Sequence, residues 1–101
     1  MFDALGLVEV NGSADGIIVV DKMLKTADVE FQTWNTKCGG HATVFVSGDV
    51  AACTEAVAAV RENPPCKVYK TAVISRPSEE TERLVIDSRE SSRFARGNRE
   101  A

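Results

Sequence analysis

The chain has 101 residues, of which 44% are hydrophobic and 27% are charged, and its formal net charge is -3 at pH 7. This length fits one domain with one modest core, and the acidic balance is the opposite of the basic surface typical of nucleic-acid-binding proteins. No apolar run reaches the roughly 18 residues of a membrane span, and the first residues lack the basic region of a secretory signal. We therefore expect a cytoplasmic protein that binds neither nucleic acid nor membrane.

The first part of the chain predicts a strand followed by a helix. Residues 2–10 are rich in Leu and Val and end at the turn signal Asn11–Gly12, a pattern typical of a strand. Apolar residues at helical spacing then predict an amphipathic helix over 14–26 with Ser13 as its N-cap. The apolar positions that we expect on the buried face are Ile17, Val20 and Leu24.

Two strands and a second helix are predicted next. Residues 29–36 and 42–46 are rich in β-branched and aromatic residues and are separated by Gly39–Gly40, so they form a hairpin-like pair. Asp49 is a good N-cap for the following helix, which Asn63–Pro64–Pro65 ends. The apolar face of that helix comprises Val50, Cys53, Val57 and Val60.

Residues 67–75 form the last predicted strand, which gives the order β-α-β-β-α-β. This order is the split βαβ arrangement of ferredoxin-like α+β domains, with an antiparallel sheet and helices on one side. We place the domain core in residues 1–77 and a C-terminal helix and polar tail in 78–101. Ser78 is a predicted N-cap for a short helix over 78–86. The arginine-rich stretch 87–101 offers too little apolar surface to offset its ordering entropy, so we interpret it as a mobile or partner-docked tail.

Four short motifs follow one another in a recognisable order, although each alone is weak. They are Ala4–Glu9 (ALGLVE), Asp21–Val29 (DKMLKTADV), Ser47–Cys53 (SGDVAAC) and Val73–Pro77 (VISRP). Together they resemble the corresponding segments of bacterial microcompartment shell proteins, and they cover roughly residues 4–77. Two departures are visible: a cysteine at position 38, and a proline-stopped connection in place of a run of small residues after the second helix.

The resemblance implies a homo-hexamer that tiles edge to edge with other shell proteins into a facet around encapsulated enzymes. In that family a lysine of the D-x-M-x-K segment and an arginine near the closing strand lie at the hexamer edge, and the matching residues here are Lys25 and Arg76. Small edge contacts add up when a ring repeats them on every side. The alternative is that both side chains are simply solvated charges.

The resemblance also implies that the loop between the second and third strands points at the sixfold axis and forms a pore for metabolites. The loop residues are Lys37, Cys38, Gly39 and Gly40. Glycine permits several chains to approach closely because it has no Cβ. Exposed backbone N–H groups and Lys37 would favour polar or anionic solutes.

Cys38 raises the question of a metal cofactor. Sixfold symmetry would gather several thiols at the axis, and thiolates hold iron–sulfur clusters. Some shell proteins, including ones from glycyl-radical-enzyme compartments, hold such clusters, so a four-iron, four-sulfur cluster shared between subunits is one interpretation. A small pore residue with a free thiol is the other. We expect Cys53 in the core and Cys66 at the start of a strand, while His41 is either a ligand or a residue packed beside the pore.

Three other functional classes are weighed against a structural shell subunit. An enzyme is disfavoured because the chain has a single histidine and no recognisable catalytic triad or phosphate-binding loop. An RNA-recognition domain needs stacking aromatics on its central strands, where only Phe45 is found. A small oligomeric regulatory domain that binds a metabolite shares the predicted fold and remains the main alternative.

Overall fold

A computed structural model describes residues 2–36 and 40–100, with side chains described as far as Arg89. The helices and strands follow the predicted order, including the predicted helix at the C-terminus, which is longer than expected. They are β1 (Ala4–Val10), α1 (Ser13–Thr26), β2 (Glu30–Thr36), β3 (Ala42–Gly48), α2 (Val50–Glu62), β4 (Val68–Ser75) and α3 (Glu79–Glu100). The predicted α+β, ferredoxin-like architecture is therefore confirmed.

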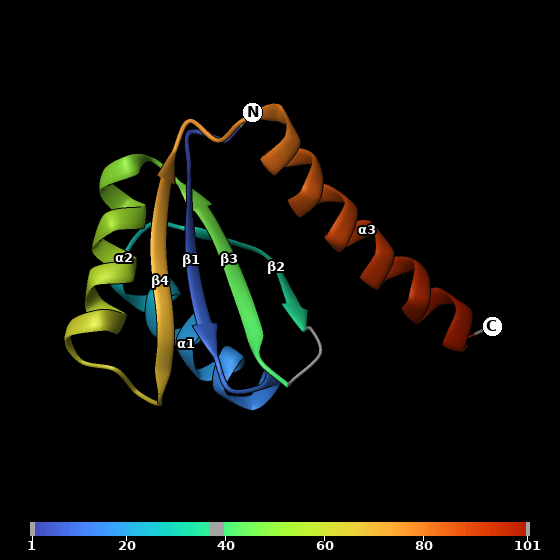
Figure 1. The fold of residues 1–101 in the computed structure, drawn as a ribbon, viewed down its shortest axis with the longest axis horizontal. Helices are drawn as coiled ribbons and strands as arrows, with labels where there is room; N and C mark the ends of the chain where they lie inside the picture. Colours follow the sequence, from blue (N-terminus) through green and yellow to red (C-terminus); the bar gives the residue numbers. More distant parts are fainter. Residues whose placement is uncertain (1, 37–39, 101) are drawn as a thin grey trace.

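The four strands form one antiparallel sheet in the spatial order β2-β3-β1-β4. The register defines two ends of this sheet. At the loop end, where β2 leads toward β3, Val10 and Thr36 both pair with Ala42. At the opposite end, Ala4 pairs with Gly48 on one side and with Ser75 on the other. The strands β2 and β4 are the two edges of the sheet (Figure 1).

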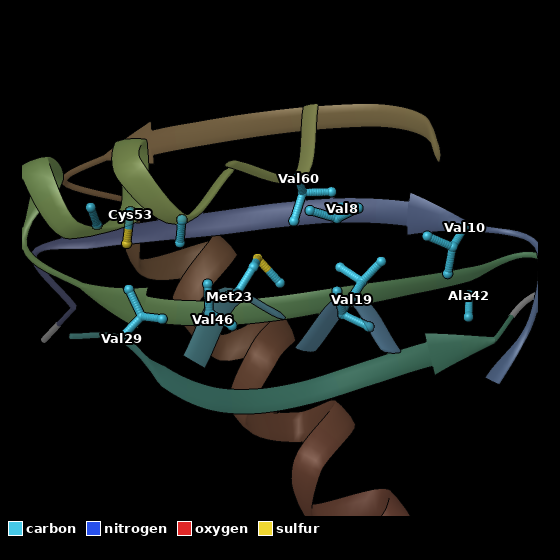
Figure 2. Close-up of a cluster of buried hydrophobic side chains, with 12 residues drawn as sticks. Val8, Val10, Val19, Met23, Val29, Ala42, Val46, Cys53 and Val60 are labelled. Carbon is cyan, nitrogen blue, oxygen red and sulfur yellow. The ribbon is translucent and has the colours of Figure 1, made fainter. Parts of the chain in front are cut away.

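The main core lies between the sheet and the pair α1 and α2. Alternate residues of β1 and β3 point toward these helices, and Figure 2 shows Val8 and Val46 among the side chains that meet Met23, Cys53 and Val60. Close packing depends on two glycines. A Cβ at Gly6 would lie 3.1 Å from methyl groups of both Val46 and Val57, and one at Gly16 would lie 3.3 Å from Val44.

Helix α1 buries a different face from the one that the sequence predicted. Its buried residues are Gly16, Val19 and Met23. Of the predicted residues, Val20 is partly buried and packs against the core, whereas Ile17 and Leu24 are exposed. The prediction was wrong for these two because apolar residues occupy consecutive positions from Ile17 to Val20, so spacing alone does not select one face. Ser13 was also wrong as the N-cap: it is the first helical residue, and Gly12 caps the helix without a side-chain hydrogen bond.

Helix α2 starts as predicted. The Asp49 carboxylate accepts a hydrogen bond from the Ala52 amide at 2.7 Å, as an N-cap side chain does. The buried face comprises Cys53, Ala56, Val57 and Val60, so the predicted face is confirmed except for Val50, which is exposed.

Helix α3 lies on the other face of the sheet from α1 and α2. Ser78 caps it through the Thr81 amide, as predicted. The helix runs to Glu100, well beyond the predicted end at residue 86, because the stretch contains no proline and many residues with good helix propensity. Figure 1 shows α3 running from the end of β4 past the β2 edge of the sheet.

Three contacts fasten α3 to the sheet. Val85 is fully buried against Leu5 and Phe45. The Glu82 carboxylate accepts a hydrogen bond from the Phe2 amide at 2.6 Å, and hydrogen bonds from the N-terminal amino group and from this amide lower the pKa of Glu82. Further along, Arg89 donates to the buried amide oxygen of Gln32, whose nitrogen donates to Ser47 at 2.7 Å. The open face of the sheet is therefore covered on its β2 side.

Candidate functional site

The loop end of the sheet carries the predicted pore residues. Lys37, Cys38 and Gly39 lie outside the described residues, so the structure places only Gly40 of the four. Gly40 has φ 84°, a conformation that favours glycine, and no atom lies within 4 Å of an added Cβ. A Cβ at Gly12 would lie 3.8 Å from the Gly40 carbonyl oxygen, so the start of α1 borders the same end. The described end of the loop is thus open and exposed.

A stack of side chains that the sequence did not predict adjoins Gly40. His41 Nδ1 lies 3.0 Å from the Glu9 carboxylate, and the His41 ring stacks on Tyr69 with centroids 4.2 Å apart and planes at 20°. Lys67 Nζ lies 5.0 Å from the centre of the Tyr69 ring, within the range of a cation–π contact. We call Glu9, His41, Lys67 and Tyr69 the loop-end stack. It joins three segments that are distant in sequence.

The two predicted edge residues lie at the opposite end of the sheet. Arg76 directly follows β4, and its backbone amide donates to the Asp3 carbonyl at 2.8 Å, with φ 50° at Arg76. Lys25 lies in the last turn of α1 and pairs with Asp21 at 2.9 Å, with 74% of its side chain exposed. Exposed pairs of this kind are weak, so the Lys25 ammonium remains available for other contacts.

An open acidic groove of about 610 Å³ lies at this same end. Four carboxylate residues line it: Asp3, Asp28, Glu30 and Asp49. Carboxylates and cationic side chains therefore occur together at the end of the sheet opposite the loop.

The flank of the domain formed by α1 and β2 exposes large apolar side chains. Lys22 donates to the Asn63 carbonyl at the end of α2, so this side of α1 faces α2. By helical periodicity, Ile17 and Leu24 lie on the other side, toward the β2 edge. There Phe31 is also exposed and makes an edge-to-face contact with Trp34. We call Ile17, Leu24 and Phe31 the α1–β2 flank.

The two described cysteines are packed against other residues, and the raised pKa of each thiol disfavours its reactive thiolate form. Cys53 is fully buried in the main core, as predicted, and desolvation followed by the charge of Asp49 raises its thiol pKa. Cys66 precedes β4, its Sγ lies 4.0 Å from the Asp15 carbonyl, and burial followed by the Asp15 charge raises its pKa. A raised pKa disfavours the thiolate that binds metals.

Within the part of the chain that the structure describes, no three His, Cys, Asp or Glu side chains are grouped as metal ligands. No described helix combines the length and apolarity required to cross a membrane.

Comparisons with known proteins agree with this geometry. Residues 4–77 match the family model of the BMC domain. The chain is 38% identical over 90 residues to the bacterial microcompartment shell protein EutK of Escherichia coli, covering 84% of this chain and 52% of EutK. It is 36% identical over 86 residues to the shell protein PduA of Citrobacter freundii, covering 82% of this chain and 91% of PduA. The chain thus spans about half the length of EutK.

A solved structure gives the same result for the fold. The crystal structure of a microcompartments protein from Desulfitobacterium hafniense DCB superposes with a TM-score of 0.66 and 33% sequence identity. The superposition covers 78% of this chain and 44% of that chain.

Proposed function

Because the chain belongs to the BMC domain family of bacterial microcompartment shell proteins, we propose that it is a structural subunit that forms cyclic hexamers and tiles with other shell proteins into facets. The shell of such a compartment lies in the cytoplasm and encloses enzymes. We propose that these enzymes are further partners of the subunit. The observation that best supports a hexamer is the exposed apolar α1–β2 flank. Such a surface marks a site of protein association.

The two flanks of the domain differ in character, and this difference favours a ring of subunits. The α1–β2 flank is apolar, whereas the β4 edge exposes the polar residues Lys70 and Ser75. Contacts between unlike surfaces are head to tail, and they close into a ring when the rotation between neighbours permits. In this arrangement the loop end of the sheet points at the symmetry axis, and Gly40 borders a pore for small metabolites.

The opposite end of the sheet then forms the rim of the hexamer. Lys25 and Arg76 are the proposed contact residues, and the acidic groove supplies complementary charge across the edge. Each contact between exposed charges contributes at most about 1 kcal/mol. A hexamer repeats it at every edge, so facets form through many weak contacts.

The test of this edge is a Lys25→Ala substitution. We expect hexamers to persist and extended sheets to disappear in electron micrographs, because the substitution removes one charge from every edge while leaving the buried face of α1 intact. Arg61→Ala is the matched control, since Arg61 is an exposed cationic residue in the last turn of α2 that belongs to no proposed contact, and it should still form sheets. Sheets of unchanged extent in Lys25→Ala would place the edge elsewhere, and a discrete dimer or trimer of the unmodified chain would favour the regulatory-domain alternative.

Cys38 is the proposed ligand of an iron–sulfur cluster at the pore. Its chemistry fits because Cys53 and Cys66 are packed and have raised pKa values, so Cys38 is the remaining cysteine, and six symmetry copies would offer more thiolates than one four-iron, four-sulfur cluster requires. Such a cluster would supply one-electron redox chemistry at the shell.

Cys38→Ser tests this ligand. Protein purified without oxygen should be brown and absorb visible light, as thiolate-ligated iron does, and the variant should lose most of its bound iron while retaining its hexameric mass. Cys66→Ser is the control and should keep the colour. A chain that stays colourless after reconstitution with iron and sulfide would rule the cluster out and leave Cys38 as a plain pore residue.

A further inference from the structure

The loop-end stack holds His41 from two directions. His41 directly follows Gly40 and precedes β3, so its ring lies where the loop enters the sheet. Glu9 of β1 contacts the ring through Nδ1, and Tyr69 of β4 covers the ring face. A hydrogen bond to one nitrogen together with a stacking contact restricts both rotation and tilt of an imidazole.

An irregularity in the sheet presents Tyr69 to this ring. The register between β1 and β4 shifts between Glu9 and Val10: Glu9 pairs with Lys70, whereas Val10 pairs with Val68. Tyr69 is therefore the extra residue of a β-bulge. Bulges redirect a side chain at one point of a strand and occur often beside functional sites. Tyr69 is 41% exposed, so burial in the core does not explain an aromatic ring at this position.

We propose that Glu9 and Tyr69 are positioning residues that fix His41 and the adjoining Gly40 backbone, and thereby set which solutes the pore admits. This inference rests on the proposed pore. Gly40 has no side chain that could hold it in place, and His41 is the next residue along the chain, so a fixed His41 restrains the Gly40 backbone. In a ring of six chains, a backbone held identically in each copy presents one defined set of amide and carbonyl groups, which is what discriminates between small polar solutes.

The first test uses Tyr69→Leu against Tyr69→Phe. Because His41 is the sole histidine of the chain, its ring protons give one identifiable set of NMR signals. We expect ring-current shifts of these signals from Tyr69 in the unmodified chain and in Tyr69→Phe, and their loss in Tyr69→Leu. The fraction of His41 rings that have left the Glu9 carboxylate should rise roughly three- to tenfold in Tyr69→Leu, the equivalent of one aromatic pair. The backbone amides of residues 40 and 41 should become more mobile at the same time.

The second test measures anion-to-cation permeability of an assembled protein sheet sealed over an aperture in a solid support. Tyr69→Leu should change this ratio while native mass spectrometry shows an unchanged ring, and Tyr69→Phe should match the unmodified protein. Glu9→Gln, which keeps a hydrogen-bonding oxygen, should lie between them.

Unchanged His41 signals, unchanged amide mobility or an unchanged permeability ratio in Tyr69→Leu would overturn the proposal. If the unmodified chain formed no ring, the proposed hexamer would fail instead, and the NMR comparison would still decide whether Tyr69 positions His41.

Discussion

Replacing Ile17 with glutamate is expected to leave the chain folded and to abolish the hexamer. Ile17 is 56% exposed on the α1–β2 flank, so the substitution removes little from the core, and glutamate has better helix propensity than isoleucine. In the ring the same position would be covered by a neighbouring subunit. An uncompensated buried charge costs about 3 kcal/mol, which weakens each contact roughly a hundredfold. Sedimentation velocity and circular dichroism measure assembly and folding on the same samples.

Leu84→Glu is the matched control for this experiment. Leu84 is also 56% exposed, but it lies on α3, on the other face of the sheet from α1. The control should remain hexameric. A hexamer that survives Ile17→Glu would show that the α1–β2 flank is not the contact between subunits, whereas loss of the hexamer in both variants would point to a general effect of added charge.

Gly6→Val should produce the largest loss of stability that we expect from a single substitution. The Cβ alone would approach methyl groups of Val46 and Val57 to 3.1 Å, and the two further methyls have no space between β1 and α2. Overpacking of this kind costs roughly 3 kcal/mol, a large part of the stability of a domain of this size. Urea unfolding followed by circular dichroism should show a clearly lower midpoint.

Ala72→Val is the control for Gly6→Val. It introduces the same side chain into the neighbouring strand at an exposed position, where valine suits a strand. Its midpoint should change little. All variants are compared at one protein concentration because assembly adds to apparent stability. Equal midpoints for the two variants would mean that α2 does not pack against Gly6 as closely as described.

Local signals predicted much of the fold. Asp49 and Ser78 mark helix starts because a short polar side chain can accept a hydrogen bond from the first helical turn. Glycine pairs and prolines mark where strands and helices end. These signals act on residues that are close in sequence, so the sequence alone is enough to identify them.

Other features depend on partners that are distant in sequence. Four consecutive apolar residues in α1 leave the buried face of the helix undecided. The close packing of Gly16 against Val44 of β3 determines which face is buried, and this contact is known only from the structure. Sequence patterns also do not show that α3 covers the open face through Val85.

The candidate site was predicted less completely than the fold. The resemblance supplied Lys25, Arg76 and the loop, but the loop-end stack was not foreseen. Its members come from β1, from the residue before β3, and from β4 and the residue before it. No sequence pattern indicates the bulge that presents Tyr69. A lone histidine next to a glycine pair was the available signal, and its partners could be identified only once the register of the strands was known.

The sheet connects the two proposed working regions of the subunit. Each strand spans the distance between the proposed rim, with Lys25 and Arg76 nearby, and the loop end, with Gly40 and His41. A strand rises about 3.3 Å per residue, so the length of the strands would set the distance between the proposed rim and the proposed axis. A constant distance in every copy is what a flat, tiled facet requires.

Native mass spectrometry of the unmodified chain shows directly whether six copies form a ring. We expect a dominant species with six times the mass of the 10.9-kDa chain, and higher masses as hexamers join at their edges. Monomers or dimers as the only species, at every concentration measured, would contradict it.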